Sequence, residues 1–332
     1  MKKFLVLALA LIVTLSLVAC TSQGNTSEVS NPENPDVRVA CILSGPISDM
    51  SWNYTAYQGL KKIEAIGAEI SYQENVENSA LPDCINTYAA DGYDVIILST
   101  NSYEEASMPI IEDYPDTQFI IINGGTTKGN VTSYAIADED QGFMQGVISA
   151  VLSKTQKVGF VGAMEITPIL NGRSGFEQGA KYINESIEVN AVMTGSFTDV
   201  AAAKETAKAM IVAGVDAIAP MCDNAALGVV EAAEEGGVIA VASGAGQDTV
   251  APNAVVCAVI KDTSIVYERA FQDYLDGKLT GDTGVVKLGA KDGVVYLSDW
   301  YNTNKDISDD AKAQISAAYK ALVDGEVTIT LN

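Results

Sequence analysis

Neutral hydrogen-bonding side chains are concentrated in segments that follow short apolar runs of the sequence. Their amide and hydroxyl groups suit an uncharged polar ligand better than a strongly charged one. The set comprises Ser44, Asn53, Ser99, Asn101, Asn123, Thr167, Asn171, Asn224, Ser243 and Gln247. Any one of these residues could equally be a turn former or a helix cap. The ten residues fall into six predicted loops, and taken together these loops favour a ligand-binding site.

Trp52 stands at the start of a predicted helix, directly after a loop that contains glycine and proline. An indole in this place could stack on a flat ligand ring, a contact worth ~0.5–1.5 kcal/mol beyond its buried area. It could also simply pack beneath a hinge. The sequence does not separate the two interpretations.

Catalysis has little support in the sequence. Histidine, the commonest general base and metal ligand, is absent. The sequence also lacks a P-loop, a G-x-S-x-G elbow and an H-E-x-x-H pair, and the doublets Glu104-Glu105 and Glu234-Glu235 lie on predicted helices as solvated charges. We therefore expect a binding protein with no cofactor and no metal. A hydrolase that works through carboxylates is the remaining enzymatic alternative.

The charge balance restricts the possible partners. The chain carries 43 acidic and 20 basic residues, for a net charge of −23. Such a surface repels phosphate backbones, so we expect no nucleic-acid binding. We expect a monomer that binds a small molecule.

The N-terminus indicates export and membrane anchoring. Lys2 and Lys3 precede an apolar run from Phe4 to Val18, which is typical of a secretory signal and short for a membrane span. The run ends in Leu17-Val18-Ala19-Cys20, which resembles the bacterial lipobox. This predicts a signal peptide at residues 1–19 and lipidation of Cys20. An ordinary signal peptide with a chance cysteine is the alternative.

The segment 20–36 is rich in Ser, Asn, Pro and Thr and has almost nothing to bury, so it predicts a flexible tether. With the lipid on Cys20, it would hold the protein at the extracytoplasmic face of the cell membrane.

The remaining cysteines show no metal-ligand spacing. They are Cys41, Cys84, Cys222 and Cys257. An even number outside the cytoplasm permits disulfides, but the sequence does not say whether any of them pair. We expect none to be essential.

From residue 37 onward, short β-branched runs alternate with segments of helical periodicity. This alternation predicts an α/β fold with parallel sheets covered on both faces. The first half predicts strands at 37–43, 69–73, 94–99 and 118–123 and helices at 51–66, 79–90 and 103–113. The second half predicts strands at 157–163, 189–194, 216–220 and 238–242 and helices at 172–186, 200–213 and 224–235. The repeated order predicts two doubly wound lobes joined by a hinge.

The third part of the chain is predicted to return between the lobes. It has strand patterns at 254–260, 284–288 and 294–297 and helix patterns at 264–275 and 308–323. We predict that lobe one comprises 37–125 and 259–292 and that lobe two comprises 126–258. The segment 293–332 is a hinge-crossing strand and helix whose lobe the sequence leaves open.

Two motifs resemble one known family. Asp49-Met50-Ser51-Trp52-Asn53, followed by Gly59, and Gly159-Phe160-Val161-Gly162, followed by Gly175-Phe176-Glu177-Gln178-Gly179, are similar to the basic membrane protein family. These are lipoprotein receptors of ABC importers that resemble purine nucleoside receptor A. The similarity runs in the same order along the whole mature chain. It implies a type I periplasmic-binding-protein fold, an ABC permease as partner, and closure on a nucleoside-like ligand.

The resemblance also assigns roles to residues. It implies that Trp52 stacks on the base, that Asn53 forms a hydrogen bond with it, and that Lys261 lies near the sugar. It brings Asp49, Met164 and Phe197 into the candidate site.

Three positions depart from the family pattern. Asn123 and Ser44 stand where the family commonly has aspartate, and Ser243-Gly244-Ala245 replaces a Gly-Val-Asp segment whose carboxylate contacts ribose. The ligand therefore stays open: a nucleoside first, then a free base or another flat heterocycle, then a sugar-like signal. A tethered sensor of a membrane signalling protein is the alternative role. The sequence does not tell whether the lobes stand open or closed.

Overall fold

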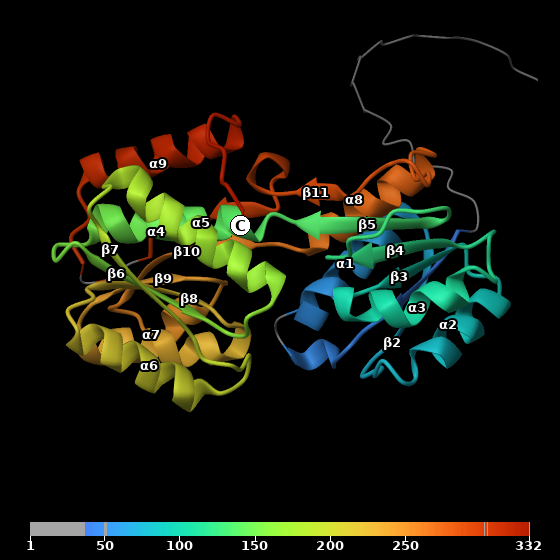
Figure 1. Cartoon of the computed structure of the whole chain (residues 1–332), viewed down its shortest axis with the longest axis horizontal. Coiled ribbons are helices and arrows are strands. Elements are labelled where there is room, and N and C mark those ends of the chain that lie inside the picture. The colour runs from blue at the N-terminus through green and yellow to red at the C-terminus, as the bar shows by residue number, and fades with distance from the viewer. Residues whose placement is uncertain (1–36, 50–51, 302, 304, 332) are drawn as a thin grey trace, which may run out of the picture. The chain divides into compact units, whose positions relative to one another are not determined.

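The structure, a computed structural model, describes residues 37–49, 52–301, 303 and 305–331. The predicted signal peptide, the tether and Cys20 lie outside these residues. The described chain forms two six-stranded sheets with helices packed on both faces (Figure 1). The predicted α/β class with two wound sheets is confirmed. Among the described helices, none has the length and apolar character needed to cross a bilayer.

The first sheet is parallel throughout and has the order β11-β5-β4-β3-β1-β2. Its strands are β1 (Arg38–Ile42), β2 (Glu69–Gln73), β3 (Val95–Leu98), β4 (Gln118–Ile122), β5 (Val131–Ile136) and β11 (Val286–Leu288). The whole of β3 is buried, as expected for a central strand covered on both faces.

Four helices cover the first sheet. They are α1 (Trp52–Ile66), α2 (Leu81–Ala90), α3 (Glu104–Ile111) and α8 (Ser264–Leu275). On one face α1 and α8 pack closely, because Gly59 leaves room for Tyr267: a Cβ at Gly59 would lie 2.6 Å from the Cβ of Tyr267. On the other face α2 and α3 enclose a second apolar cluster.

The second sheet has the order β12-β10-β9-β8-β6-β7. Its strands are β6 (Lys157–Gly162), β7 (Glu188–Met193), β8 (Ala217–Met221), β9 (Ile239–Ala242), β10 (Val255–Lys261) and β12 (Val295–Leu297). Only the edge pair β10–β12 is antiparallel. The helices are α4 (Asp138–Leu152), α5 (Thr167–Ile183), α6 (Val200–Val212), α7 (Ala226–Gly236) and α9 (Asp309–Val323). Of these, α4, α5 and α9 pack on one face, and α6 and α7 on the other.

The pair α4 and α5 is in unusually close contact. A Cβ on Gly142 would lie 1.8 Å from the carbonyl oxygen of Gly172, and a Cβ on Gly146 would lie 2.1 Å from that of Phe176. The two backbones can touch only because these positions lack side chains. Helix α4 is thereby fixed against the rest of the second lobe.

The predicted boundary between the lobes differs from the sheet membership. The sequence assigned residues from 126 onward to lobe two, but β5 pairs with β4 and β11 in the first sheet. The chain first passes from one sheet to the other at Ala137, between β5 and α4. It passes again after Lys261, and a third time between β11 and β12. Both β12 and α9, whose lobe the sequence left open, pack with the second lobe.

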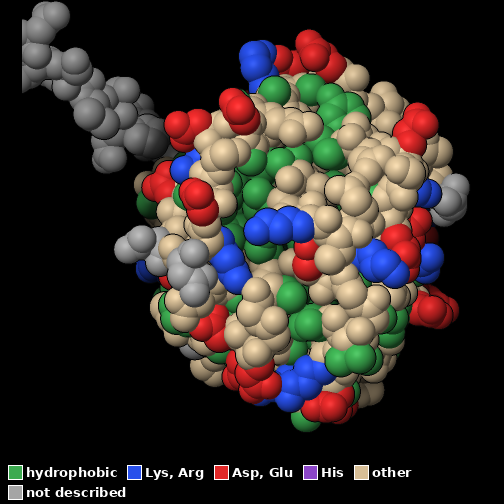
Figure 2. Space-filling model, turned by 90° about the vertical axis from the view of Figure 1, so that its left-hand side faces the viewer, with side chains coloured by type: hydrophobic (Ala, Val, Ile, Leu, Met, Phe, Trp, Pro, Cys, Tyr) green, Lys and Arg blue, Asp and Glu red, His purple; other side chains and the backbone are tan. Residues whose placement is uncertain are grey.

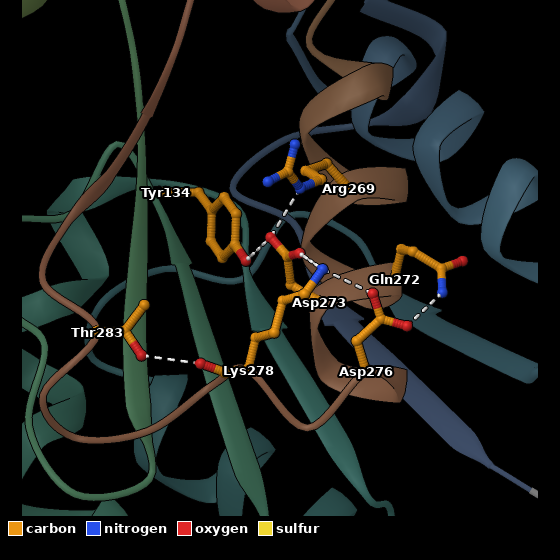
Figure 3. A network of polar contacts seen from close by, with 7 residues as sticks. All are labelled: Tyr134, Arg269, Gln272, Asp273, Asp276, Lys278 and Thr283. Carbon is orange, nitrogen blue, oxygen red and sulfur yellow. Dashed lines mark hydrogen bonds and ion pairs between the residues drawn. The ribbon is translucent and has the colours of Figure 1, made fainter.

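A buried carboxylate fastens β5 to α8 (Figure 3). Asp273, 4% exposed, accepts hydrogen bonds from the Tyr134 hydroxyl at 2.9 Å and from Arg269 Nε at 2.8 Å. Lys278 Nζ reaches its other oxygen at 3.3 Å. Burial, and then the bond to Asp273, raises the pKa of Tyr134. The network holds the strand that leads into the first crossing.

The four described cysteines, Cys41, Cys84, Cys222 and Cys257, are all buried and form no disulfide with one another. Burial raises their pKa values, to about 11 for Cys84 and to about 12 for Cys222 and Cys257. They pack as small apolar side chains.

Candidate ligand-binding site

A cavity of about 360 Å³ lies where the first sheet ends and where α4 and α5 begin. Four of the polar residues singled out in the sequence, Asn101, Asn123, Thr167 and Asn171, line it. The other residues of its wall are Glu104, Gly124, Gly125, Ala135, Ile136, Asp138, Pro168 and Lys287. Strand ends and helix N-termini converge at this point, as expected for ligand sites of wound sheets. The volume falls within the usual range for small-molecule pockets, roughly 300–1,000 Å³.

Asn123 has a special backbone conformation at the end of β4. Its φ of 58° lies in the left-handed region, which asparagine tolerates better than most residues. Its Oδ1 accepts a hydrogen bond from the backbone N–H of Ile136 at 2.9 Å, so the loop after β4 is held against the end of β5. With Oδ1 occupied, the side-chain amide nitrogen is the group that can donate to a ligand.

Trp52 and Asn53 connect the loops after β1 and β3. The indole Nε1 of Trp52 donates to the carbonyl oxygen of Ser99 at 2.9 Å, and the Oδ1 of Asn53 accepts from the N–H of Gly45 at 3.1 Å. Trp52 is half-buried and packs against the apolar cluster beneath α1. It does not line the 360 Å³ cavity, so its stacking role stays a prediction.

An ion pair joins the first and second segments at which the chain passes from one sheet to the other, which are called the first and second crossings. Lys261 Nζ, at the end of β10, contacts Asp138 Oδ1, at the start of α4, at 2.5 Å. Asp138 is 2% exposed and the Lys261 side chain 19%. Burial by itself would lower the pKa of Lys261, but the Asp138 carboxylate outweighs burial and raises it. Lys261 is therefore a charged hydrogen-bond donor beside the cavity at neutral pH.

The next two carboxylates on α4 join the third crossing. Glu139 forms an ion pair with Lys287 of β11, and Asp140 Oδ2 accepts from the N–H of Ala290 at 2.8 Å. Acidic side chains in a first helical turn also interact favourably with the helix dipole. Burial raises the pKa of Asp140 to about 6. Three consecutive side chains thus bind the three crossing segments together.

The remaining predicted residues lie outside this cavity. Met164 is 44% exposed, and Phe197 packs partly buried against both apolar clusters of the second lobe. Ser44 and Asn224 are exposed, and Ser243 and Gly244 are partly exposed in the loop after β9. The side chain of Asp49 lies outside the description.

Sequence reasoning missed Glu104, Asp138 and Lys287 in the cavity wall. Asp138 directly follows the apolar end of β5, so the rule of strand ends would have found it. That strand was not predicted, and the acidic triplet was therefore not placed at a strand end.

A larger hollow of about 500 Å³ runs along α1 and the start of α8. Mostly helical side chains such as Gln58, Lys61 and Lys62 line it, and Asp262, directly after β10, is the one described residue of its wall that follows a strand end. The 360 Å³ cavity is therefore the better candidate. Within the described ranges no cluster of three or more Cys, Asp or Glu side chains could hold a metal ion.

Two wound sheets with a polar cavity at strand ends are the architecture of the periplasmic-binding-protein fold. A solved solute-binding protein of an ABC transporter system from Conexibacter woesei has this fold, with a TM-score of 0.73 and 21% identity over 89% of this chain and 98% of that one.

The family model described as ABC transporter substrate-binding protein PnrA-like, Bmp, matches residues 36–330. The chain belongs to this family, as the motifs predicted, and it is therefore a substrate-binding protein of ABC transporters and not an enzyme. It is 28% identical to the ABC transporter nucleoside-binding protein BmpA of Lactococcus lactis, covering 97% of each chain. It is also 28% identical to the transcriptional activator protein Med of Bacillus subtilis, covering 76% of this chain and 81% of that one.

Proposed function

We propose that this protein captures a nucleoside outside the cytoplasm and delivers it to an ABC permease. The observation that carries the proposal is the cavity at the strand ends, whose wall contains three asparagines and Asp138, the partner of Lys261. Amide groups can form hydrogen bonds with the edge of a base. The similar protein of Lactococcus lactis is named as nucleoside-binding.

The charges in the cavity wall argue for a ligand without phosphate. Glu104, Asp138 and Lys287 belong to the wall, and both Asp138 and Lys287 are already paired with opposite charges. An anionic phosphate would meet Glu104 and Asp138 without a free cation in the described wall. A neutral nucleoside avoids this repulsion.

Closure of the two lobes is the proposed capture step. The ligand would bind the first lobe, with Trp52 stacked on its base, and groups of the second lobe such as Asn171 would then complete its hydrogen bonds. The lipid on Cys20 would keep the protein next to its permease. Affinity then depends on the difference in ligand contacts between the open and the closed state.

The direct test is to unfold the purified protein and identify any released small molecule by mass spectrometry, and then to titrate the ligand-free protein with nucleosides, bases and nucleotides by calorimetry. We expect nucleosides to bind and nucleoside monophosphates not to bind. Failure of every nucleoside to bind would refute the proposal. Radiolabelled palmitate incorporation into the wild type, but not into Cys20→Ala, would test the anchor.

A second candidate role is that of a tethered sensor, a regulatory role that we consider because the similar Bacillus subtilis protein is named as a transcriptional activator. Direct contact with DNA is disfavoured by the net charge of −23. The face shown in Figure 2 also carries acidic and basic side chains intermixed, without a continuous basic field. Cross-linking in intact cells separates the roles, since a transporter subunit should capture a permease and a sensor should capture a signalling protein.

A further inference from the structure

Lys287 is the one basic side chain among the described residues that line the 360 Å³ cavity. It lies on β11, the edge strand of the first sheet. A lysine in a pocket wall would ordinarily attract an anionic ligand such as a phosphate. Its Nζ instead forms an ion pair with Glu139 Oε1, in the first turn of α4. Because the Lys287 side chain is 41% exposed, it could reach a ligand if Glu139 released it.

Glu139 depends on Lys287 for the stability of its charge. Its side chain is 9% exposed, and its Oε2 is buried without a hydrogen-bond partner among the described residues. A buried carboxylate that loses its counter-charge is strongly destabilised. An anionic ligand that drew Lys287 away would leave Glu139 in that state. The ion pair therefore opposes recruitment of Lys287 by an anion.

Glu139 acts through Lys287 and does not line the cavity itself. Its backbone is in direct contact with α5, since a Cβ on Gly175 would lie 2.1 Å from the carbonyl oxygen of Glu139. Gly175 belongs to the second of the two family motifs, and this contact gives that glycine a role. The carboxylate is thus carried by a helix turn whose position is fixed by packing.

With Lys287 engaged, the charges of the wall leave an acid in excess. Asp138 is paired with Lys261 at 2.5 Å. Glu104 lines the cavity and has no ion-pair partner in the described part of the chain, although its Oε2 accepts a hydrogen bond from the N–H of Gly125 at 2.9 Å. A phosphate in the cavity would therefore meet an uncompensated negative charge.

We propose that Glu139 determines which ligand charge the cavity accepts: by holding Lys287 it makes the cavity reject anionic ligands such as nucleoside phosphates, an inference that rests on the proposed function. Glu139 is on this account a specificity-determining residue that touches no ligand. Release of Lys287 from Glu139 would give a phosphate the cation that it lacks in the wild type.

The ligand side can be tested on the unmodified protein by calorimetry. Adenosine 5′-monophosphate, largely dianionic at pH 7 because its second pKa is about 6, is compared with 5′-O-sulfamoyladenosine, which is similar in size and uncharged. We expect the sulfamoyl compound to bind roughly 10-fold more tightly or better. Equal affinities would show that the cavity excludes by size or not at all, and would overturn the inference while leaving nucleoside binding intact. If neither compound nor adenosine binds, the proposed function is refuted and the inference with it.

The protein side uses Glu139→Gln, which removes the charge that holds Lys287 and retains the length of the side chain. The freed Lys287 can form a charge-assisted hydrogen bond with the phosphate, so the preference for the sulfamoyl compound should fall by roughly 10-fold. The double variant Glu139→Gln/Lys287→Gln removes the freed amine and has the net charge of the wild type, and the preference should return. Glu188→Gln also removes an acid from an ion pair, with Lys157 at 2.9 Å at the other end of the second sheet, and should keep the wild-type preference.

Three results of these titrations would contradict the role of Glu139. They are an unchanged preference in Glu139→Gln, an equal fall in Glu188→Gln, and a preference that stays low in the double variant. A ratio of two affinities does not respond to a uniform loss of folded protein, so a merely structural effect of Glu139→Gln would leave it unchanged. If Glu139→Gln fails to fold, the comparison of the two adenosine compounds on the unmodified protein decides alone.

Discussion

The indole nitrogen of Trp52 donates to the backbone carbonyl of Ser99 at 2.9 Å, joining the first turn of α1 to the loop after β3. This bond fixes the plane of the ring at the strand ends of the first sheet. A ring oriented in this way could offer a face to a flat ligand, because its polar edge is already occupied.

We expect Trp52→Ala to weaken nucleoside affinity more than it weakens folding. Loss of stacking should reduce affinity roughly 3- to 10-fold, in line with ~0.5–1.5 kcal/mol for an aromatic pair. Trp52→Phe should restore part of this affinity, since a ring remains but the bond to Ser99 is lost. Titration calorimetry measures the affinity and urea unfolding the stability. Tyr54→Ala, an exposed aromatic on the same helix, is the control, and a loss there equal to that of Trp52→Ala would contradict a stacking role.

The contact between α4 and α5 predicts a severe effect of a single methyl group. In Gly142→Ala the new Cβ would lie 1.8 Å from the carbonyl oxygen of Gly172, a backbone atom that cannot rotate away. Overpacking typically lowers the free energy of unfolding by about 1–3 kcal/mol. Because this clash involves the backbone, we expect Gly142→Ala to lower it by about 3 kcal/mol or more. At Gly125 the nearest atom to a new Cβ would be 3.9 Å away, so Gly125→Ala should unfold at nearly the wild-type urea concentration. Equal midpoints for the two variants would show that the helices can separate.

The secondary structure that the sequence predicts best is the part with a one-sided apolar pattern. The predicted strand 69–73 and helix 264–275 match β2 and α8 without a shift. Helix α5 begins at Thr167, five residues before its predicted start, because its first turn starts with Thr167-Pro168 and buries only Ile169. Such a turn has a helix-start signal but no apolar repeat.

Helix α4 and strand β5 were not predicted because both are buried on almost every side, which hides the alternation of polar and apolar residues. From Gln141 to Ala150 every residue of α4 is buried, so there is no polar face to reveal a period of 3.6 residues. Its glycines are also typical of loops, although in the structure they allow α4 to pack closely against α5. The omission carried over to the site: Asp138 could not be placed at a strand end, whereas Asn101 and Asn123, which follow predicted strands, were placed correctly at the ends of β3 and β4.

The raised pKa of Asp140, about 6, predicts a pH dependence of stability. Because the folded-state pKa lies above the ordinary value of 3.8, this group's contribution is fully present below about pH 4 and is lost as the pH rises through about 6. Asp140→Asn should therefore be more stable than the wild type at pH 7, by about 1–3 kcal/mol, and the difference should shrink toward pH 4. Urea unfolding at pH 4, 5, 6 and 7 measures this difference. Asp282→Asn, in an exposed loop, controls for net charge, and an identical pH profile in both variants would exclude Asp140 as the cause.

The network around Asp273 makes a prediction about how its bonds are coupled. Tyr134→Phe removes one hydrogen bond to a buried carboxylate and should cost about 1–2 kcal/mol, since the bonded oxygen keeps Arg269. Asp273→Asn should cost more, about 2–4 kcal/mol, because it removes the charge that both Arg269 and Lys278 contact. The cost stays below that of a fully buried pair, since those two side chains are about half exposed and can return to water. In the double variant Tyr134→Phe should lower the free energy of unfolding by less than it does alone, because the acceptor of its hydrogen bond has already lost its charge. Strictly additive changes in the free energy of unfolding would show that the tyrosine bond does not depend on the charge.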